Sequence, residues 1–165
     1  MHAPLVQIDK EHLQDFKVLF KTLEESKATV WISTPSFAEM CLVDPSFNQD
    51  LLPELEQFVF CGEKLFSTTV EKLMERFPRA EVVNTYGPTE STVMVTWMPL
   101  TRELLEKYPD NLPVGVIKPG TTVLIDGPES GEIIICGNTV AKGYYENPEM
   151  NAKHFFEVDG ERAYR

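Results

Sequence analysis

The chain has 165 residues, of which 42% are apolar and 25% are charged, a composition typical of a globular protein that excludes a disordered or fibrous one. The net charge of −11, without a cluster of lysine and arginine, argues against binding to nucleic acid. No stretch approaches the roughly 20 apolar residues of a membrane span, and the N-terminal residues lack the apolar core of a signal peptide. We therefore expect no membrane insertion and no export.

Helices and strands alternate in the first half of the chain. Apolar residues near the N-terminus recur at steps of three and four, the period of an amphipathic helix. Short β-branched runs, which favour buried strands, alternate with further helical segments. The predicted order is helix 10–25, strand 28–34, a helix opening at Pro35, strand 57–63, helix 67–77 and strand 80–87. This alternation predicts an α/β fold with a parallel sheet.

The alternation of helices and strands stops in the second half, where short extended runs are broken by proline and glycine. The predicted elements are a turn at Pro119-Gly120, a strand at 131–137 and a short helix at 147–156 that is capped by Asn151 or an upstream polar residue. We therefore expect a parallel-sheet α/β part at residues 1–97, followed by a β-rich part at residues 98–165.

Neither the cysteines nor the histidines predict a metal site. The three cysteines are widely spaced without a C-x-x-C pair, which argues against a disulfide framework and a zinc site and fits a reducing cytoplasm: Cys41, Cys61 and Cys136. The histidines lack companions at ligand spacing and are expected to be solvated or structural: His2, His12 and His154.

The stretch NTYGPTE carries the residues most suited to chemistry, and it follows the third predicted strand, where ligands of such sheets gather. Gly87 permits a close approach that a Cβ would block, and Pro88 stiffens the turn. Thr89 offers a hydroxyl, Glu90 an oxygen ligand suited to Mg²⁺, and Tyr86 a flat face on which a base can stack. These are the components of a nucleotide site.

The same stretch has a simpler interpretation as a turn that caps a helix. Thr89 would then be the N-cap, and Glu90 would be favoured by the helix dipole. The tetrapeptide GPTE alone leaves both interpretations open.

A second motif decides between them. NTYGPTE, followed some forty residues later by GEIIICGNTVAKGYYENPEMNAKHF, resembles two signature motifs of the adenylate-forming superfamily, which contains acyl-CoA ligases, luciferases and peptide-synthetase adenylation domains. The matching positions are Gly131, Glu132, Ile133, Gly137, Val140, Gly143, Tyr144, Pro148 and Phe155. The resemblance implies that the chain is part of the large N-terminal domain of such an enzyme.

The cysteine in FCGE indicates which group within the superfamily the chain resembles. Cys61 stands where most relatives carry glycine or another small residue, and in this it resembles the ligases that load D-alanine onto a D-alanyl carrier protein for teichoic acid esterification in Gram-positive bacteria. The resemblance implies an attack of the D-alanine carboxylate on the α-phosphorus of Mg²⁺-bound ATP, which releases pyrophosphate. A phosphopantetheine thiol of the carrier protein then captures the D-alanyl-adenylate.

The resemblance also assigns roles to individual residues. Tyr86 would lie against the adenine, Thr89 would donate to the α-phosphate and Glu90 would hold Mg²⁺. The remaining ATP-binding residues would be Asn84, Thr85, Gly87 and Pro88 in the loop, with Gly62 and Glu63 running past the adenine edge. Cys61, Gly87 and Val93 would contact the amino acid, although Cys61 could equally be an inert buried cysteine. Four aromatic residues are expected to pack the β-rich part: Tyr144, Tyr145, Phe155 and Phe156.

Other parts of the family pattern are expected outside this chain. The phosphate loop and the aspartate that binds the amine belong upstream of Met1, the ribose-binding aspartate belongs after Arg165, and the catalytic lysine lies in a C-terminal domain. We therefore expect the 165 residues alone to be inactive. Two alternatives stay open, namely an adenylation module for another small, L-configured amino acid and a non-catalytic interaction domain.

Overall fold

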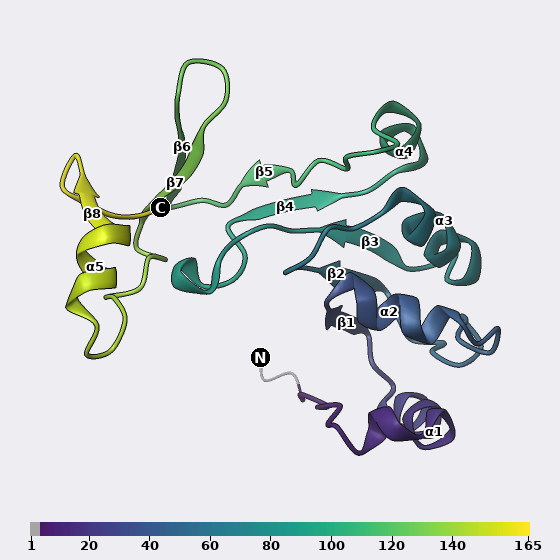
Figure 1. Ribbon diagram of the computed structural model, residues 1–165. Coiled ribbons are helices and arrows are strands. Elements are labelled where there is room, and N and C mark those ends of the chain that lie inside the picture. Colours follow the sequence, from purple (N-terminus) through teal and green to yellow (C-terminus); the bar gives the residue numbers. More distant parts are fainter. Residues whose placement is uncertain (1–3) are drawn as a thin grey trace. The chain divides into compact units, whose positions relative to one another are not determined.

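The computed structural model describes residues 4–165, which fold into two compact units (Figure 1). The first unit extends to Val83 and includes Pro99–Leu112, and the second contains Asn84–Met98 and Pro113–Arg165. The division between residues 97 and 98 expected from the sequence stays a prediction. His2 lies outside the described residues.

The first unit contains a sheet with helices, as the α/β pattern predicts. Its strands are β1 (Val30–Ser33), β2 (Gln57–Phe60) and β3 (Glu81–Asn84), which lie side by side in this order. β1 and β2 run parallel, with Val30 beside Gln57, so the prediction of parallel pairing is confirmed for these strands. The helices are α1 (Phe16–Ser26), α2 (Pro35–Leu42), α3 (Ser67–Arg76) and α4 (Arg102–Lys107).

Aromatic rings form the core of the first unit. Phe77 lies edge-on against Phe47 and Phe58, with ring centroids 4.9 and 5.0 Å apart, and all three side chains are fully buried. Val70 and Leu73 of α3 are buried as well, as their spacing predicts. Each such side chain contributes about 1.5–3 kcal/mol through burial.

The first helix begins later than its apolar pattern predicts. α1 begins at Phe16 rather than near residue 10, because Asp15 is extended and its side chain accepts a hydrogen bond from the Lys17 N–H, 2.8 Å away. Leu13, which the pattern placed on the buried face, is 42% exposed. A strong N-cap thus overrides the apolar period at this end.

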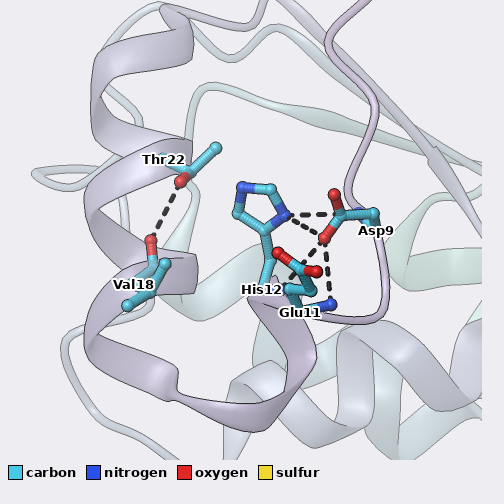
Figure 2. Close-up of polar contacts among 5 residues, drawn as sticks. All are labelled: Asp9, Glu11, His12, Val18 and Thr22. Carbon is cyan, nitrogen blue, oxygen red and sulfur yellow. Dashed lines mark hydrogen bonds and ion pairs between the residues drawn. The ribbon is translucent and has the colours of Figure 1, made fainter.

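A separate 3₁₀ helix (His12–Gln14) precedes α1. Asp9 Oδ1 accepts hydrogen bonds from the N–H groups of Glu11 and His12 and contacts the His12 ring, as Figure 2 shows. Thr22 Oγ1 within α1 donates to the Val18 oxygen, 3.0 Å away (Figure 2). The His12 ring therefore makes a local contact with Asp9, three residues before it.

The strand β1 is covered on one face only. Trp31 is 6% exposed whereas its neighbour Ile32 is 67% exposed, because successive side chains point to opposite faces of a strand. The prediction that this strand is buried was therefore wrong. The strand itself was predicted correctly.

The second unit is rich in β-structure. β4 (Thr96–Pro99) pairs antiparallel with β5 (Val116–Ile117). An antiparallel sheet follows with the order β6-β7-β9-β8, formed by β6 (Thr121–Asp126), β7 (Glu132–Gly137), β9 (Glu161–Tyr164) and β8 (Phe155–Val158). Its core contains Val95, Ile135 and Val140, against which Phe155 and Tyr164 pack.

The short helix α5 (Pro148–His154) has the predicted position but ends earlier. Its cap is the upstream Asn147, whose side chain accepts a hydrogen bond from the Met150 N–H, rather than Asn151. Phe155 and Phe156 belong to β8. Within residues 4–165, no helix combines the length and the apolar character that a membrane crossing requires.

Candidate active site

The NTYGPTE stretch begins at Asn84, the last residue of β3, and continues as a loop of the second unit. Hydrogen bonds fix the first residues of this loop. Asn84 is buried and its Nδ2 donates to the Pro113 oxygen, 3.0 Å away. The Tyr86 N–H donates to Thr96 Oγ1 at 3.1 Å, and the Tyr86 oxygen accepts from the Val95 N–H at 2.8 Å. The backbone of Tyr86 is therefore held while its ring is part-exposed.

Gly87 is required by the chain itself. A Cβ at this position would lie 2.5 Å from the Val93 oxygen and 2.9 Å from the Val95 nitrogen. Gly87 therefore permits the close approach of Val93 and Val95, later in the same loop.

The centre of the loop is a 3₁₀ helix (Thr89–Ser91). Pro88 is its N-cap, and the Pro88 oxygen accepts from the Ser91 N–H at 3.0 Å. Thr89 is the first helical residue rather than the cap, so the interpretation of a Thr89-capped helix was wrong. Thr89 is exposed and Ser91 is fully buried.

Two consecutive residues after this turn adopt a left-handed backbone. Thr92 and Val93 have φ values of 63° and 66°. The conformation is strained for a β-branched residue and is retained at functional sites when the surrounding structure enforces it. About half of the Val93 side chain is exposed.

Glu90 is held at both its backbone and its side chain. Its oxygen accepts from the Ala141 N–H at 2.7 Å, and its carboxylate Oε1 accepts from the Tyr144 hydroxyl at 2.6 Å. The hydrogen bond from Tyr144 lowers the pKa of Glu90, more than burial raises it. Glu90 is therefore ionised at neutral pH.

An ionised carboxylate of this kind suits Mg²⁺. Among the described residues, no group of three or more histidine, cysteine, aspartate or glutamate side chains could hold a metal ion. Mg²⁺ does not need such a group, because it commonly binds one or two carboxylates together with substrate phosphates. Glu90 fits this kind of site.

The FCGE stretch lies in the first unit and begins at Phe60, the last residue of β2. The Cys61 N–H donates to the Ser33 oxygen at 3.3 Å, and the Cys61 side chain is part-exposed. Gly62 has a φ of 92°, which favours glycine. The Glu63 carboxylate accepts from both the N–H and the Oγ of Ser36, each at 3.1 Å. The Glu63 side chain thus binds the first turn of α2.

The remaining cysteines and His154 are structural. Cys41 and Cys136 are buried, and burial raises the pKa of the Cys41 thiol to about 12. His154 Nδ1 lies 2.9 Å from the Arg165 oxygen. No disulfide joins the described cysteines.

Sequence reasoning missed the contact of Tyr144 with Glu90. The Tyr144 ring does pack, edge-on against Phe155 with centroids 5.3 Å apart, but its hydroxyl reaches a residue 54 positions away. The only signal in the sequence is that the hydroxyl of a partly buried tyrosine needs a partner. The packing expected for Tyr145 was wrong, since that side chain is 89% exposed.

The chain is similar to known proteins both in sequence and in fold. Residues 3–145 match the family described as AMP-binding enzyme, and the chain belongs to this family. It is 47% identical over 169 residues to the D-alanine--D-alanyl carrier protein ligase of Lacticaseibacillus casei, a match that covers 98% of this chain and 33% of that protein. The ligase of the same name from Bacillus licheniformis is 49% identical over 167 residues, with 96% and 33% covered. The chain thus spans about a third of the length of these curated relatives.

Solved structures of adenylation domains have the same fold. One is an NRPS protein containing adenylation and PCP domains, bound to a vinylsulfonamide inhibitor, with 31% identity and a TM-score of 0.77 over 92% of this chain and 28% of that one. Another is a Vibrio cholerae adenylation domain in complex with glycyl-adenosine-5'-phosphate, with 26% identity and a TM-score of 0.73 over 89% of this chain and 30% of that one.

Proposed function

We propose that the protein that carries this chain activates D-alanine as D-alanyl-adenylate at the expense of ATP and transfers it to the phosphopantetheine thiol of a D-alanyl carrier protein. The observation that carries the proposal is the identity of 47–49% with ligases of that name along nearly the whole chain. The product serves D-alanylation of teichoic acids in the cell wall of a Gram-positive bacterium. The reaction takes place in the cytoplasm, where ATP is available.

Residues of the loop bind and orient the nucleotide. Tyr86 lies against the adenine, and Thr89, whose side chain is exposed on the 3₁₀ turn, donates to the α-phosphate. Glu90 holds Mg²⁺, which supplies positive charge where negative charge develops on the phosphate oxygens. The proposal is supported by the ionised carboxylate of Glu90 and the fixed backbone of Tyr86.

The other site residues have supporting roles. Asn84, Thr85, Gly87 and Pro88 shape the loop, and the backbone of Gly62 and Glu63 passes the adenine edge. Cys61, Gly87 and Val93 contact the amino acid. A part-exposed cysteine and a part-exposed valine are compatible with contact to a substrate.

Pyrophosphate exchange by the full-length protein tests the substrate. We expect exchange with D-alanine to exceed exchange with L-alanine and with glycine. A preference for L-alanine or glycine would instead identify a module for another small amino acid, a candidate favoured by the similarity to a domain solved with glycyl-adenosine-5'-phosphate.

The Glu90→Gln variant tests whether the loop is catalytic at all. It keeps the shape and a hydrogen-bond acceptor but removes the charge that Mg²⁺ requires, so exchange should be lost. Full exchange by this variant would favour a non-catalytic interaction domain. The separate 165-residue chain should bind Mg·ATP weakly at best, and micromolar affinity in isothermal titration would contradict this.

A further inference from the structure

Tyr144 connects the β-rich sheet region to the carboxylate of Glu90. Its hydroxyl lies 2.6 Å from Glu90 Oε1 and 3.4 Å from the hydroxyl of Tyr164. Its ring packs edge-on against Phe155, with 5.3 Å between the centroids. A ring fixed by packing delivers its hydroxyl to a defined point, so the carboxylate is held in one orientation.

The backbone of Tyr144 is itself held by one side chain of α5. Asn151 Oδ1 accepts from the Tyr144 N–H at 2.6 Å, and Asn151 Nδ2 donates to the Tyr144 oxygen at 2.9 Å. Asn151 thus binds both polar backbone groups of the same residue. A Cβ on the preceding Gly143 would lie 2.8 Å from Asn151 Oδ1, so this arrangement requires glycine there.

Residues 139–144, the segment that ends at Tyr144, also hold the backbone around Glu90. The Ala141 N–H donates to the Glu90 oxygen at 2.7 Å, and Thr92 Oγ1 donates to the Thr139 oxygen at 2.8 Å. Residues 139–144 therefore hold the 3₁₀ turn by its backbone and by the side chain of Glu90. All of these contacts lie within the second unit.

We propose that Tyr144 and Asn151 are positioning residues for Glu90, with Asn151 fixing Tyr144 and Tyr144 holding the carboxylate in the orientation that receives the cation. This inference rests on the proposed role of Glu90 in Mg²⁺ binding. A glutamate side chain loses rotamer freedom when it is ordered, and a preformed orientation removes that loss from the binding step. Hydrogen-bond partners of metal ligands commonly act in this way.

The test uses the full-length protein with the variants Tyr144→Phe and Asn151→Ala. Tyr144→Phe keeps the packed ring and removes only the hydroxyl. Tyr145→Phe is the matched control, because the neighbouring tyrosine is exposed and loses the same atom. Two quantities are measured: the Mg²⁺ concentration that gives half-maximal pyrophosphate exchange, and the affinity for Mn²⁺, measured by electron paramagnetic resonance with a non-hydrolysable ATP analogue.

We expect Tyr144→Phe to raise the half-maximal Mg²⁺ concentration and to weaken Mn²⁺ binding by about tenfold, the lower end of the range for partners of metal ligands. Asn151→Ala should shift both in the same direction, and Tyr145→Phe should shift neither. Exchange at saturating Mg²⁺ should recover in Tyr144→Phe, because the ligand itself is intact. If Tyr144→Phe does not fold, Asn151→Asp provides the second variant, since it keeps the acceptor for the Tyr144 N–H and loses the donor.

The outcomes separate this inference from the proposed function. If Glu90→Gln loses exchange and Mn²⁺ binding while Tyr144→Phe behaves like Tyr145→Phe, the positioning role is overturned and the proposed function stands. If Glu90→Gln leaves both quantities unchanged, the metal-binding role of Glu90 fails and the positioning role fails with it.

Discussion

Gly87 faces the main-chain oxygen of Val93 so closely that a methyl group on Gly87 would lie 2.5 Å from it. Gly87→Ala therefore forces the two arms of the loop apart. We expect a loss of about 3 kcal/mol in the free energy of unfolding, at the upper end of the range for overpacking, together with a higher KM for ATP. Urea denaturation and pyrophosphate exchange of the full-length protein measure the two effects.

Gly160→Ala is the control for this substitution. Gly160 has a φ of 80°, but a Cβ there would meet nothing within 4 Å. It should cost only about 1 kcal/mol from the left-handed backbone and leave the KM for ATP unchanged. Equal effects at both positions would contradict the contact with Val93 as the reason why position 87 requires glycine.

The carboxylate of Glu63 is expected to stabilise the protein without contributing to nucleotide binding. It accepts two hydrogen bonds from Ser36 in the first turn of α2. Glu63→Ala should cost about 1 kcal/mol of unfolding free energy, as the loss of a helix cap does. Its KM for ATP should change by less than about twofold, because only the backbone is assigned to the adenine. Glu63→Gln keeps an acceptor oxygen, so its unfolding free energy should lie between those of the unchanged protein and of Glu63→Ala. A large rise in the KM for ATP of Glu63→Ala would contradict the assignment of only the backbone to the adenine.

Cys61 is expected to influence the choice between enantiomers. If it lines the amino-acid pocket, Cys61→Ala should reduce the discrimination of D-alanine from L-alanine by about 1–2 kcal/mol, the size of a small steric change in a pocket. Pyrophosphate exchange with both enantiomers measures the ratio. Cys41→Ala is the control, because Cys41 is a core residue of α2 and should leave the ratio unchanged. An unchanged ratio in Cys61→Ala would exclude Cys61 from the pocket.

Burial of Cys41 predicts a pH-dependent contribution to stability. Its folded-state pKa is raised by burial from an ordinary value of 9.0 to about 12. The folded state therefore binds the thiol proton more tightly, so this contribution is fully present below about pH 9 and is lost as the pH rises toward 12. At pH 8, iodoacetamide should label Cys61 well before Cys41, as peptide mass spectrometry of the full-length protein can show. Equal labelling rates in the folded protein would contradict the burial of Cys41.

The elements that the sequence predicts well are those whose local signals agree. Val70 and Leu73 of α3 and Phe77 directly after it are buried, as their spacing predicts, and in α2 the proline at the first position sets the start. Prediction fails where two signals compete. At α1 the apolar period continues back through Leu13, but the side chain of Asp15 caps the helix and starts it at Phe16.

The loop at Glu90 could be predicted from its residue types, but its geometry could not. The Tyr144 hydroxyl lies 54 positions from Glu90 along the chain, and no local pattern connects residues at that separation. The left-handed backbone of Thr92 and Val93 could not be predicted from the sequence either, because β-branched residues disfavour that conformation. The hydrogen bonds of Glu90 to Tyr144 and of Thr92 to the Thr139 oxygen both join the loop to residues 139–144.

The attachment of Glu90 to residues 139–144 also determines where the chain can change in length. The hairpin tip at 127–131, between β6 and β7, is exposed, and inserted residues there would extend into solvent. A single residue inserted between Ala141 and Tyr144 would separate the N–H that binds the Glu90 backbone from the hydroxyl that binds its carboxylate. Natural variants of this protein should therefore differ in length at the hairpin tip and keep the spacing of Ala141, Tyr144 and Asn151 constant.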